Sequence, residues 1–421
     1  MAQLNIAAIS PAIPELVSAL AQQFHEEPTV YNSLKTSTNK KKVGGKGYRI
    51  PSRFRPPAGI TYHSEGGAFG TPVNMAFDDM YVNPTAVSLA GEVSGRTIRN
   101  IEDADSAIDG MKDLFEMYAS ALTDDIEKNC FGDGTGLRAT VSGIASNPTF
   151  DFATSPAAAF GSTKGAVHLI VGETYDVLNA AGTTNRGTVI VASKTNTQAT
   201  LTAGTATLAN ILATDVLVLT GAYKKAFRGF AYLIDRGTGT FQLNSRASYP
   251  ELNSVVIDLA GSACTVSTFN KITNLQAARM GKKDSKSQAA LMPLAQDDLL
   301  RRLGQNFKRW DGDATTYNGS FERFAYGSLN VMVCVRQDED RIYLTDLKDV
   351  ERYVEMDFGV YDLDGNTLRM KSGTNGVGSD AYTFALGLQM NIGITQPRLH
   401  ALIKRADITD AATESGAFAS A

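Results

Sequence analysis

The sequence predicts an α+β protein that carries a small inserted β subdomain. Apolar residues recur every three or four positions in three long stretches, which is typical of amphipathic helices. Between the first and second stretch lies a long segment rich in Thr, Ala, Gly and Val with short strand-like runs. The chain has 421 residues, 43% of them hydrophobic and 20% charged, so it is long enough for two or three folded units.

The longest helix is expected after the candidate caps Asp103, Asp105 and Ser106, and it should end at Gly132. Its apolar positions are Ile108, Met111, Phe115, Tyr118, Leu122 and Ile126. Similar spacings in STFNKITNLQAARMG (267–281) and AQDDLLRRLGQNFKRW (295–310) predict two further helices. A short amphipathic helix is also predicted between Ser10 and Pro28.

The strands are expected in the remaining segments. Residues 60–100 alternate short Thr-, Val- and Tyr-containing runs with Gly and Pro, which predicts an extended hairpin or loop. The runs AVHLIV, TVIVAS and DVLVLTGA predict a small antiparallel β unit. Strands resume in SLNVMVCV and DAYTFALGLQMNIGI, with a hairpin turn at Asp364-Gly365 between them.

The long helix is strongly acidic. Between Glu102 and Lys128 there are nine Asp or Glu residues against two lysines. Four of these acids are candidates for contact with a basic partner: Asp105, Asp109, Asp113 and Glu116. The helix therefore offers a negative surface to any positively charged segment.

A basic stretch has the opposite character, because no acidic residue occurs between Pro28 and Ser64. Its candidate contact residues are Lys40, Lys41, Lys42, Lys46, Arg49, Arg53 and Arg55. A phosphate-binding P-loop is excluded, because Gly47 stands where the Ser or Thr after the lysine would ligate Mg²⁺. Three interpretations remain open: an arm that binds an acidic protein surface, which we favour, a grip on nucleic-acid phosphates without sequence preference, or a solvated run without function.

The sequence gives no support for an enzyme, a metal site or a cofactor. His25, His63, His168 and His400 are scattered singly, and no GxSxG nucleophile elbow is present. Asp362 and Asp364 begin like a calcium loop, but Gly373 replaces the bidentate Glu that the loop requires.

The cellular context is also limited by composition. The net charge of −4 and the pI near 5.7 exclude a protein that binds polyanions with its whole surface. Three widely separated cysteines predict neither a disulfide framework nor zinc binding, and indicate synthesis in a reducing cytoplasm. Neither a signal peptide nor a membrane-spanning segment is expected.

In their order along the chain, these segments resemble the major capsid protein of tailed bacteriophages, which has the Hong Kong 97-like capsid fold. An N-terminal arm and an extended loop precede a long helix that ends in KNCFGDGTG. The resemblance continues through GLRATVSGIASNPTF, TGAYKKAFRGFAYLID, STFNKITNLQAARMG, LMPLAQDDLLRRLG and QPRLHALIKRA. The middle portion, which contains AVHLIVGETYDVLNAAGTTNRGTVIVAS, is similar to the β insertion that some members carry.

The resemblance implies an N-terminal arm, an extended β-hairpin loop, a long spine helix, and peripheral and axial domains. The expected boundaries are 1–45 for the arm, 46–100 for the extended loop, 101–160 for the spine helix and first part of the peripheral domain, 161–222 for the inserted β subdomain, 223–285 for the rest of the peripheral domain, 286–410 for the axial domain and return strands, and 411–421 for a flexible tail.

The resemblance also implies an assembly protein. Copies of the chain would form hexamers and pentamers in an icosahedral shell around packaged double-stranded DNA, located in the virion after synthesis in the host bacterial cytoplasm. Portal and scaffolding proteins would be partners, together with decoration proteins in some relatives; no cofactor and no membrane are implied. We expect the basic arm and loop of one subunit to lie across the acidic helix of its neighbour.

Two other kinds of protein stay open as alternatives. A cellular encapsulin-like compartment shares the fold class but encloses cargo enzymes, and such chains are usually shorter and lack the β insertion. Another virion structural protein, such as a tail protein, would consist mainly of strands, which the long acidic helix argues against.

Overall fold

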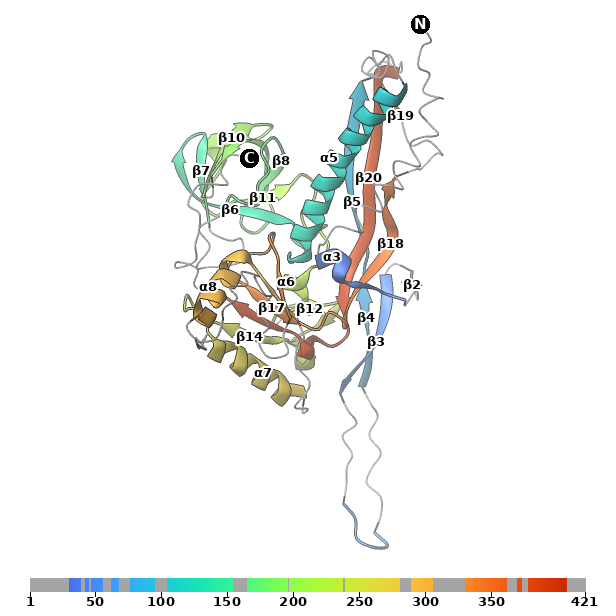
Figure 1. Ribbon diagram of the computed structural model, residues 1–421, viewed down its shortest axis with the longest axis vertical. Coiled ribbons are helices and arrows are strands. Elements are labelled where there is room, and N and C mark those ends of the chain that lie inside the picture. Colours follow the sequence, from blue (N-terminus) through green and yellow to red (C-terminus); the bar gives the residue numbers. More distant parts are fainter. Residues whose placement is uncertain are drawn as a thin grey trace, which may run out of the picture.

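The computed structural model describes residues 30–38, 42–44, 47–55, 62–67, 76–94, 104–153, 165–195, 197–237, 239–280, 289–305, 330–361, 369–372 and 378–406. The predicted helix before Pro28, the turn at Asp364-Gly365 and the tail 411–421 lie outside these residues. The described chain mixes helices and sheets, which confirms the α+β class. Figure 1 shows three parts: a long helix beside a long sheet, a β-barrel, and a smaller unit of helices and strands.

The long sheet is built around β20 (Gly378–Ile394). One edge of β20 pairs antiparallel with β5. The other edge pairs antiparallel with β18 along residues 386–394 and with β19 along residues 378–383. The outermost strand, β1, pairs parallel with β18. The bounds of these neighbours are Lys35–Thr36 for β1, Thr85–Ser94 for β5, Val350–Val360 for β18 and Arg369–Ser372 for β19.

The predicted long helix is confirmed as α5 (Ala104–Cys130), which runs alongside β5 and β20 (Figure 1). Leu122 and Ile126, two positions of the predicted apolar stripe, are buried in the core beneath it. Tyr118 meets Phe384 of β20 edge-on, with ring centroids 5.5 Å apart. The Phe384 ring covers Gly91 on the paired strand, where a Cβ would lie only 2.3 Å from the ring. Glycine at this position of β5 therefore leaves space for the Phe384 ring, whose contact with Tyr118 packs α5 on the sheet.

The extended hairpin is present as β3 (Gly47–Arg55) and β4 (Ala76–Val82), paired antiparallel from Tyr48–Val82 to Arg55–Ala76. The short β2 (Lys42–Val43) folds back on the start of β3. Gly47 has a φ of +83°, and a Cβ there would lie 2.3 Å from the Val82 carbonyl oxygen. Only glycine fits this backbone approach at the base of the hairpin.

Hydrogen bonds from distant segments hold that base in place. The Tyr81 amide donates to the Gln242 carbonyl oxygen at 3.0 Å, in the turn between β12 (Thr240–Phe241) and β13 (Asn244–Ser245). From β20, the Asn391 side chain donates to the Asn83 carbonyl oxygen at 2.6 Å. The direction of the hairpin is therefore set by the body of the molecule.

The predicted β insertion is a closed six-stranded antiparallel barrel with its own apolar core. Around the barrel the order is β10, β7, β6, β11, β8, β9. The strands are β6 Leu137–Ser146, β7 Thr149–Phe152, β8 Thr174–Leu178, β9 Asn185–Lys194, β10 Gln198–Ala203 and β11 Val216–Leu219, with the 3₁₀ turn η1 at Leu208–Asn210. The expected boundary at residue 161 needs correction, because β6 and β7 close the barrel and it begins at Leu137.

The third part is a mixed sheet flanked by two helices (Figure 1). Its strand order is β14, β21, β17, β15, β16, with bounds Val255–Asp258, Ala401–Lys404, Ile342–Thr345, Ala289–Met292 and Asn330–Val333. The flanking helices are α7 (Val266–Met280) and α8 (Leu294–Gln305), both predicted from spacing. Short turns complete the unit: α6 Phe230–Leu233, η2 Pro250–Leu252 and η3 Pro397–Leu399.

The end of the expected N-terminal arm belongs to the body of this chain. Val30 and Tyr31 in α3 (Val30–Ser33), and Leu34 after it, are buried in the core beneath α5. The Arg352 guanidinium lies over the Tyr31 ring at 4.9 Å and donates to the Thr36 hydroxyl at 2.6 Å. The arm expected over 1–45 is thus not peripheral as a whole, because its apolar residues from 30 onward pack on the same subunit.

Candidate functional site

The basic residues proposed as a contact surface are only partly described. Lys40, Lys41 and Lys46 lie outside the described residues. Arg53 and Arg55 lie on β3, where the backbone alone is described. Lys42 and Arg49 are the two members of the set whose contacts are known.

Both of these cations pair with acids of the same chain. Lys42 on β2 forms an ion pair with Glu355 on β18, and both side chains are well exposed to solvent. Arg49 on β3 pairs with Asp79 on β4, with Nε and Oδ2 2.8 Å apart. These contacts join the hairpin to the long sheet and its two strands to each other. The structure does not bring these two residues to the α5 helix of their own chain.

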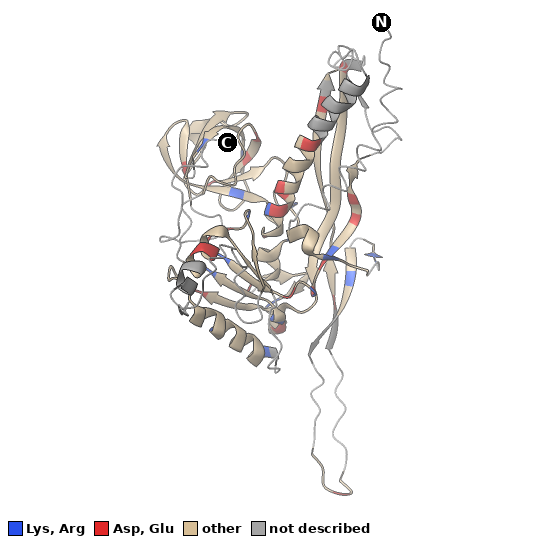
Figure 2. Ribbon diagram, in the orientation of Figure 1, with Lys and Arg blue, Asp and Glu red and all other residues tan. Residues whose placement is uncertain are grey.

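The acidic helix divides into two halves. Asp105, Asp109 and Asp113 lie on α5 where only the backbone is described, and Glu116 follows as a half-buried residue. In Figure 2 acidic residues are visible along α5 and on β18.

Acids in the second half of α5 are engaged within the chain. Asp124 pairs with Arg336 at 2.5 Å, and Asp125 pairs with Arg138 on β6. The negative charges of Asp124 and Asp125 are therefore compensated inside the subunit, and a contact of the first half of α5 with a partner stays a prediction.

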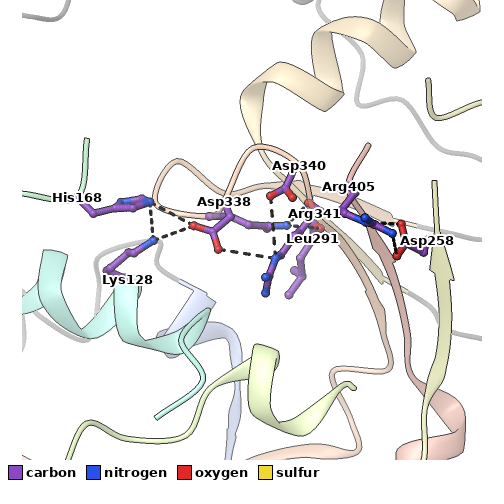
Figure 3. Close-up of polar contacts among 9 residues, drawn as sticks. Lys128, His168, Asp258, Leu291, Asp338, Asp340, Arg341 and Arg405 are labelled. Carbon is purple, nitrogen blue, oxygen red and sulfur yellow. Dashed lines mark hydrogen bonds and ion pairs between the residues drawn. The ribbon is translucent and has the colours of Figure 1, made fainter. Parts of the chain in front are cut away.

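A charged cluster lies where α5, the barrel and the loop between β16 and β17 meet. Figure 3 shows Lys128, His168 and Asp338 pointing toward one another from these three elements. The Lys128 ammonium lies 2.7 Å from Nε2 of His168 and 3.1 Å from Oδ1 of Asp338, and His168 lies 3.2 Å from the same carboxylate. Each side chain is less than 15% exposed, because the three elements cover it from different sides.

Burial and neighbouring charge determine protonation in this cluster. Burial and the charge of Lys128 lower the pKa of His168 to about 4. Burial alone would raise the pKa of Asp338, but the charges of Lys128 and Arg341 hold it well below its usual range. At neutral pH the cluster therefore contains an ammonium, a carboxylate and an uncharged imidazole that accepts a hydrogen bond from the ammonium.

The pKa of a second carboxyl group in the same loop is shifted in the opposite direction. Asp340 is fully buried, and its contact with Arg341 is 4.0 Å long. Burial raises the pKa of Asp340 to about 6, and the nearby charge of Asp338 acts in the same direction against Arg341. Farther along the sheet Arg405 pairs with Asp258 through two hydrogen bonds (Figure 3).

His400 takes part in a buried chain of hydrogen bonds. Its Nδ1 lies 2.8 Å from the Thr345 hydroxyl and its Nε2 lies 3.0 Å from Oδ2 of Asp349. The order hydroxyl, imidazole, carboxylate is that of a hydrolase triad. Thr345 and His400 are both fully buried, however, so this hydroxyl is closed to a substrate and the chain of bonds holds β17 and η3 together.

Sequence reasoning missed these buried groups. In the sequence His168 and His400 are single, scattered histidines, because their acidic partners Asp338 and Asp349 are far away in the chain. Arg246 was not singled out, although its buried guanidinium donates to the carbonyl oxygens of Tyr232, Leu233, Asp235 and Leu252. The position of Arg246 in a strand-rich apolar segment could have drawn attention to it, but the sequence does not identify the groups that it contacts.

Other candidate sites give little. Within the described ranges, no group of three or more His, Cys, Asp or Glu residues is placed to hold a metal ion. All three cysteines are buried and unbridged, as the sequence predicted. None of the helices in the described part of the chain combines the length and apolarity needed to cross a membrane.

No known protein family matches the sequence, and no curated protein matches it. Comparison of the fold with solved structures does find similar chains. The cyanophage A-1(L) capsid asymmetric unit aligns over 89% of this chain and 90% of its own, with 11% identity and a TM-score of 0.49. The capsid of a native GTA particle aligns over 90% of each chain, with 9% identity and a TM-score of 0.44. A virus-like particle from Pyrococcus furiosus aligns over 93% of this chain and 99% of its own, with 8% identity and a TM-score of 0.37.

Proposed function

We propose that this chain is a capsid shell protein, and specifically the major capsid protein of a tailed double-stranded DNA bacteriophage. Copies would assemble as hexamers and pentamers into the icosahedral head of the virion. Portal and scaffolding proteins would be partners in that assembly, with decoration proteins on the finished shell. The packaged DNA would be held through its phosphates, without sequence preference.

The observation that carries this proposal is the projecting hairpin. In the part of the chain that the structure describes, the distal residues of β3 and β4 have only each other as strand partners, and the ribbon leads away from the body (Figure 1). A two-stranded ribbon is at best marginally stable by itself in water. Its base is nevertheless fixed by hydrogen bonds from Gln242 and Asn391. A hairpin aimed by its own subunit but lacking support at its far end is suited to lie on another copy.

Charge indicates where that copy would receive it. Lys42 and Arg49 form ion pairs within the chain, so we expect a neighbour to be contacted through Lys40, Lys41, Lys46, Arg53 and Arg55. On α5, Asp124 and Asp125 are likewise paired within the chain, and we expect the contact to involve Asp105, Asp109 and Asp113, with Glu116 beside them. We therefore place the contact between subunits on the first half of α5, and expect assembly to weaken as salt increases.

Electron microscopy of the purified protein tests the proposal. Wild-type protein should form closed shells on the order of tens of nanometres across, because identical subunits with one self-complementary contact set close symmetrically. A variant in which a four-residue turn replaces residues 56–75 should keep the circular-dichroism spectrum of the folded subunit but give no shells. Normal shells from this variant would contradict the role of the hairpin.

The contents of particles from the native source distinguish the two shell functions. Packaged double-stranded DNA supports the bacteriophage head. Shells that hold a protein cargo and no DNA would instead identify a cellular compartment of the encapsulin type. Failure of the wild-type chain to form any closed particle, with or without added scaffolding protein, would overturn both.

A further inference from the structure

The barrel and the body have separate apolar cores. The barrel core consists of residues between Ala139 and Leu217, and the core beneath α5 contains none of the barrel residues that the structure describes. Each unit can therefore keep its own packing when the contact between the two changes.

Two segments connect the barrel to the body, residues 131–136 on entry and 220–229 on exit. They run side by side, since the Lys224 amide donates to the Thr135 carbonyl oxygen at 3.0 Å. Gly134, Gly136 and Gly221 all have positive φ values, between +77° and +85°. We call these two segments the neck. Phe131 and Phe227 anchor the body ends of both segments in the core beneath α5, so rotation would occur at the glycines between these anchors and the barrel.

Polar contacts hold the barrel against α5 beyond the neck. In the first, Arg138 donates to Asp125 and to the Asn129 side-chain oxygen, which lie one turn apart on α5. In the second, His168 of the barrel meets Lys128 of α5 and Asp338 of the β16–β17 loop. The second contact contains a histidine and can therefore be switched by a proton, whereas the guanidinium of Arg138 stays charged.

We propose that the barrel is a separately folded unit that rotates about its neck. The contact of His168 with Lys128 and Asp338, which we call the catch, holds the barrel against α5 at neutral pH, and acid breaks this contact. The inference concerns the chain itself and does not rest on the proposed function.

The atoms at the catch explain why one proton is enough. Burial lowers the pKa of Lys128. While Lys128 is an ammonium it can only donate, so in the 2.7 Å contact the Nε2 atom of His168 is then the acceptor and carries no proton. Protonation of Nε2 would place two N–H groups and two positive charges against each other. Arg138 from β6 and Arg341 from the loop add positive charge, and Asp338 is the single carboxylate that touches the catch.

The sign follows from linkage. With the barrel closed, the pKa of His168 is about 4, while an opened, solvated imidazole returns to its ordinary value of 6.5. The open state therefore binds more protons between these two values, and closure weakens as the pH falls through them. Between pH 7.5 and 5.0 this predicts a shift of about 30-fold toward the open state. Protonation of Asp338 favours the open state only below the ordinary pKa of a carboxyl group. Asp340 lies within the loop, away from the barrel contact.

Single-molecule energy transfer on the full chain measures this opening. Dyes on Ala180→Cys in the barrel and Lys271→Cys on α7 report the distance between the two units, and the three native cysteines are buried. The ratio of open to closed molecules should rise about 30-fold from pH 7.5 to pH 5.0. In His168→Asn, which cannot be protonated, this pH response should disappear. His63→Asn, at an exposed histidine outside the catch, should respond like the wild type.

Several results would overturn the inference. One is an unchanged distance at pH 5.0 in protein whose near-ultraviolet circular dichroism shows it to be folded. Another is an equal pH response in His168→Asn, and a third is global unfolding at the same pH as the distance change. Asp338→Asn serves as a second variant in case His168→Asn does not fold, and it should raise the open fraction already at pH 7.5.

Discussion

Arg138, on the first strand of the barrel, donates a hydrogen bond to Asp125 on α5 and so joins two units with separate apolar cores. The Arg138 side chain is only 6% exposed, and Asn129 provides a second acceptor 3.2 Å away. The pair follows directly from the chain path, because β6 starts just after α5 ends and folds back beside the last turns of the helix.

Removing the cation of this pair should be costly. Arg138→Ala leaves the partly buried Asp125 carboxylate without its partner, which typically destabilises a protein by about 3 kcal/mol or more. Urea unfolding of the full chain measures the loss. Arg49→Ala is the matched control, since its pair with Asp79 is solvent-exposed and should contribute at most about 1 kcal/mol. Equal losses in the two variants would contradict the structural role given to Arg138.

Gly229 should not tolerate a side chain. A Cβ at this position would lie 2.1 Å from the Cys130 carbonyl oxygen and 2.4 Å from that of Asn129, at the C-terminal end of α5. Gly229→Ala should therefore lower the free energy of unfolding by about 2–3 kcal/mol, because backbone has to move. At Gly237 no atom lies within 4 Å of the added methyl, so Gly237→Ala should change stability by less than about 1 kcal/mol. Thermal unfolding compares the two, and similar melting temperatures would refute the predicted clash.

Asp340 should make the protein less stable as the pH rises. Its folded-state pKa is raised to about 6 by burial, so folding takes up a proton between the ordinary carboxyl pKa and 6. Stability contributed by this group is complete at low pH and is lost as the pH rises through that window. Asp340→Asn removes the ionisation and should stabilise the protein by about 2 kcal/mol at pH 7.5, with little gain at pH 4. Chemical unfolding at both pH values checks this, and a gain that does not vary with pH would count against it.

Charge reversal tests the proposed contact between subunits. Changing Lys40, Lys41 and Lys46 together to Glu should leave the subunit folded but abolish or strongly reduce shell formation, because like charges would then face α5. Adding Asp105→Lys, Asp109→Lys and Asp113→Lys to the same chain should restore part of the assembly. Light scattering and negative-stain microscopy give the yield of shells.

The control for this experiment reverses two exposed lysines elsewhere, Lys271 and Lys348. It should assemble normally. Normal shells from the triple lysine variant, or no recovery in the combined variant, would show that the basic stretch does not bind the acidic helix.

Much of the secondary structure could be read from local pattern. α5, α7 and α8 were predicted because apolar residues at helical spacing describe one buried face, and β9, β11 and β20 were predicted from their β-branched and aromatic runs. The strand expected at AVHLIV (166–171) is wrong, because these residues form turns that cover the barrel core. The start of the barrel was misjudged by more than twenty residues. The segment 137–152 has strand texture in either case, and only its pairing with β10 and β11 assigns it to the barrel.

The charged stretches illustrate the same limit for the candidate site. The basic run and the acidic helix are visible in the sequence, but pairing is a property of three-dimensional distance. Lys42 meets Glu355, which follows it by more than three hundred residues, and Asp124 meets Arg336. The contacts of the other basic residues with a neighbouring subunit stay a prediction.

The sequence by itself determined the α+β class, the long acidic helix, the hairpin and the presence of a β insertion, because each depends on periodicity, turn residues or charge within one segment. Tertiary structure alone decided that Val30, Tyr31 and Leu34 pack into the core, that the barrel core is separate, and that His168 contacts both Lys128 and Asp338. Those features depend on which distant segments meet, and on the burial that shifts a pKa once they do.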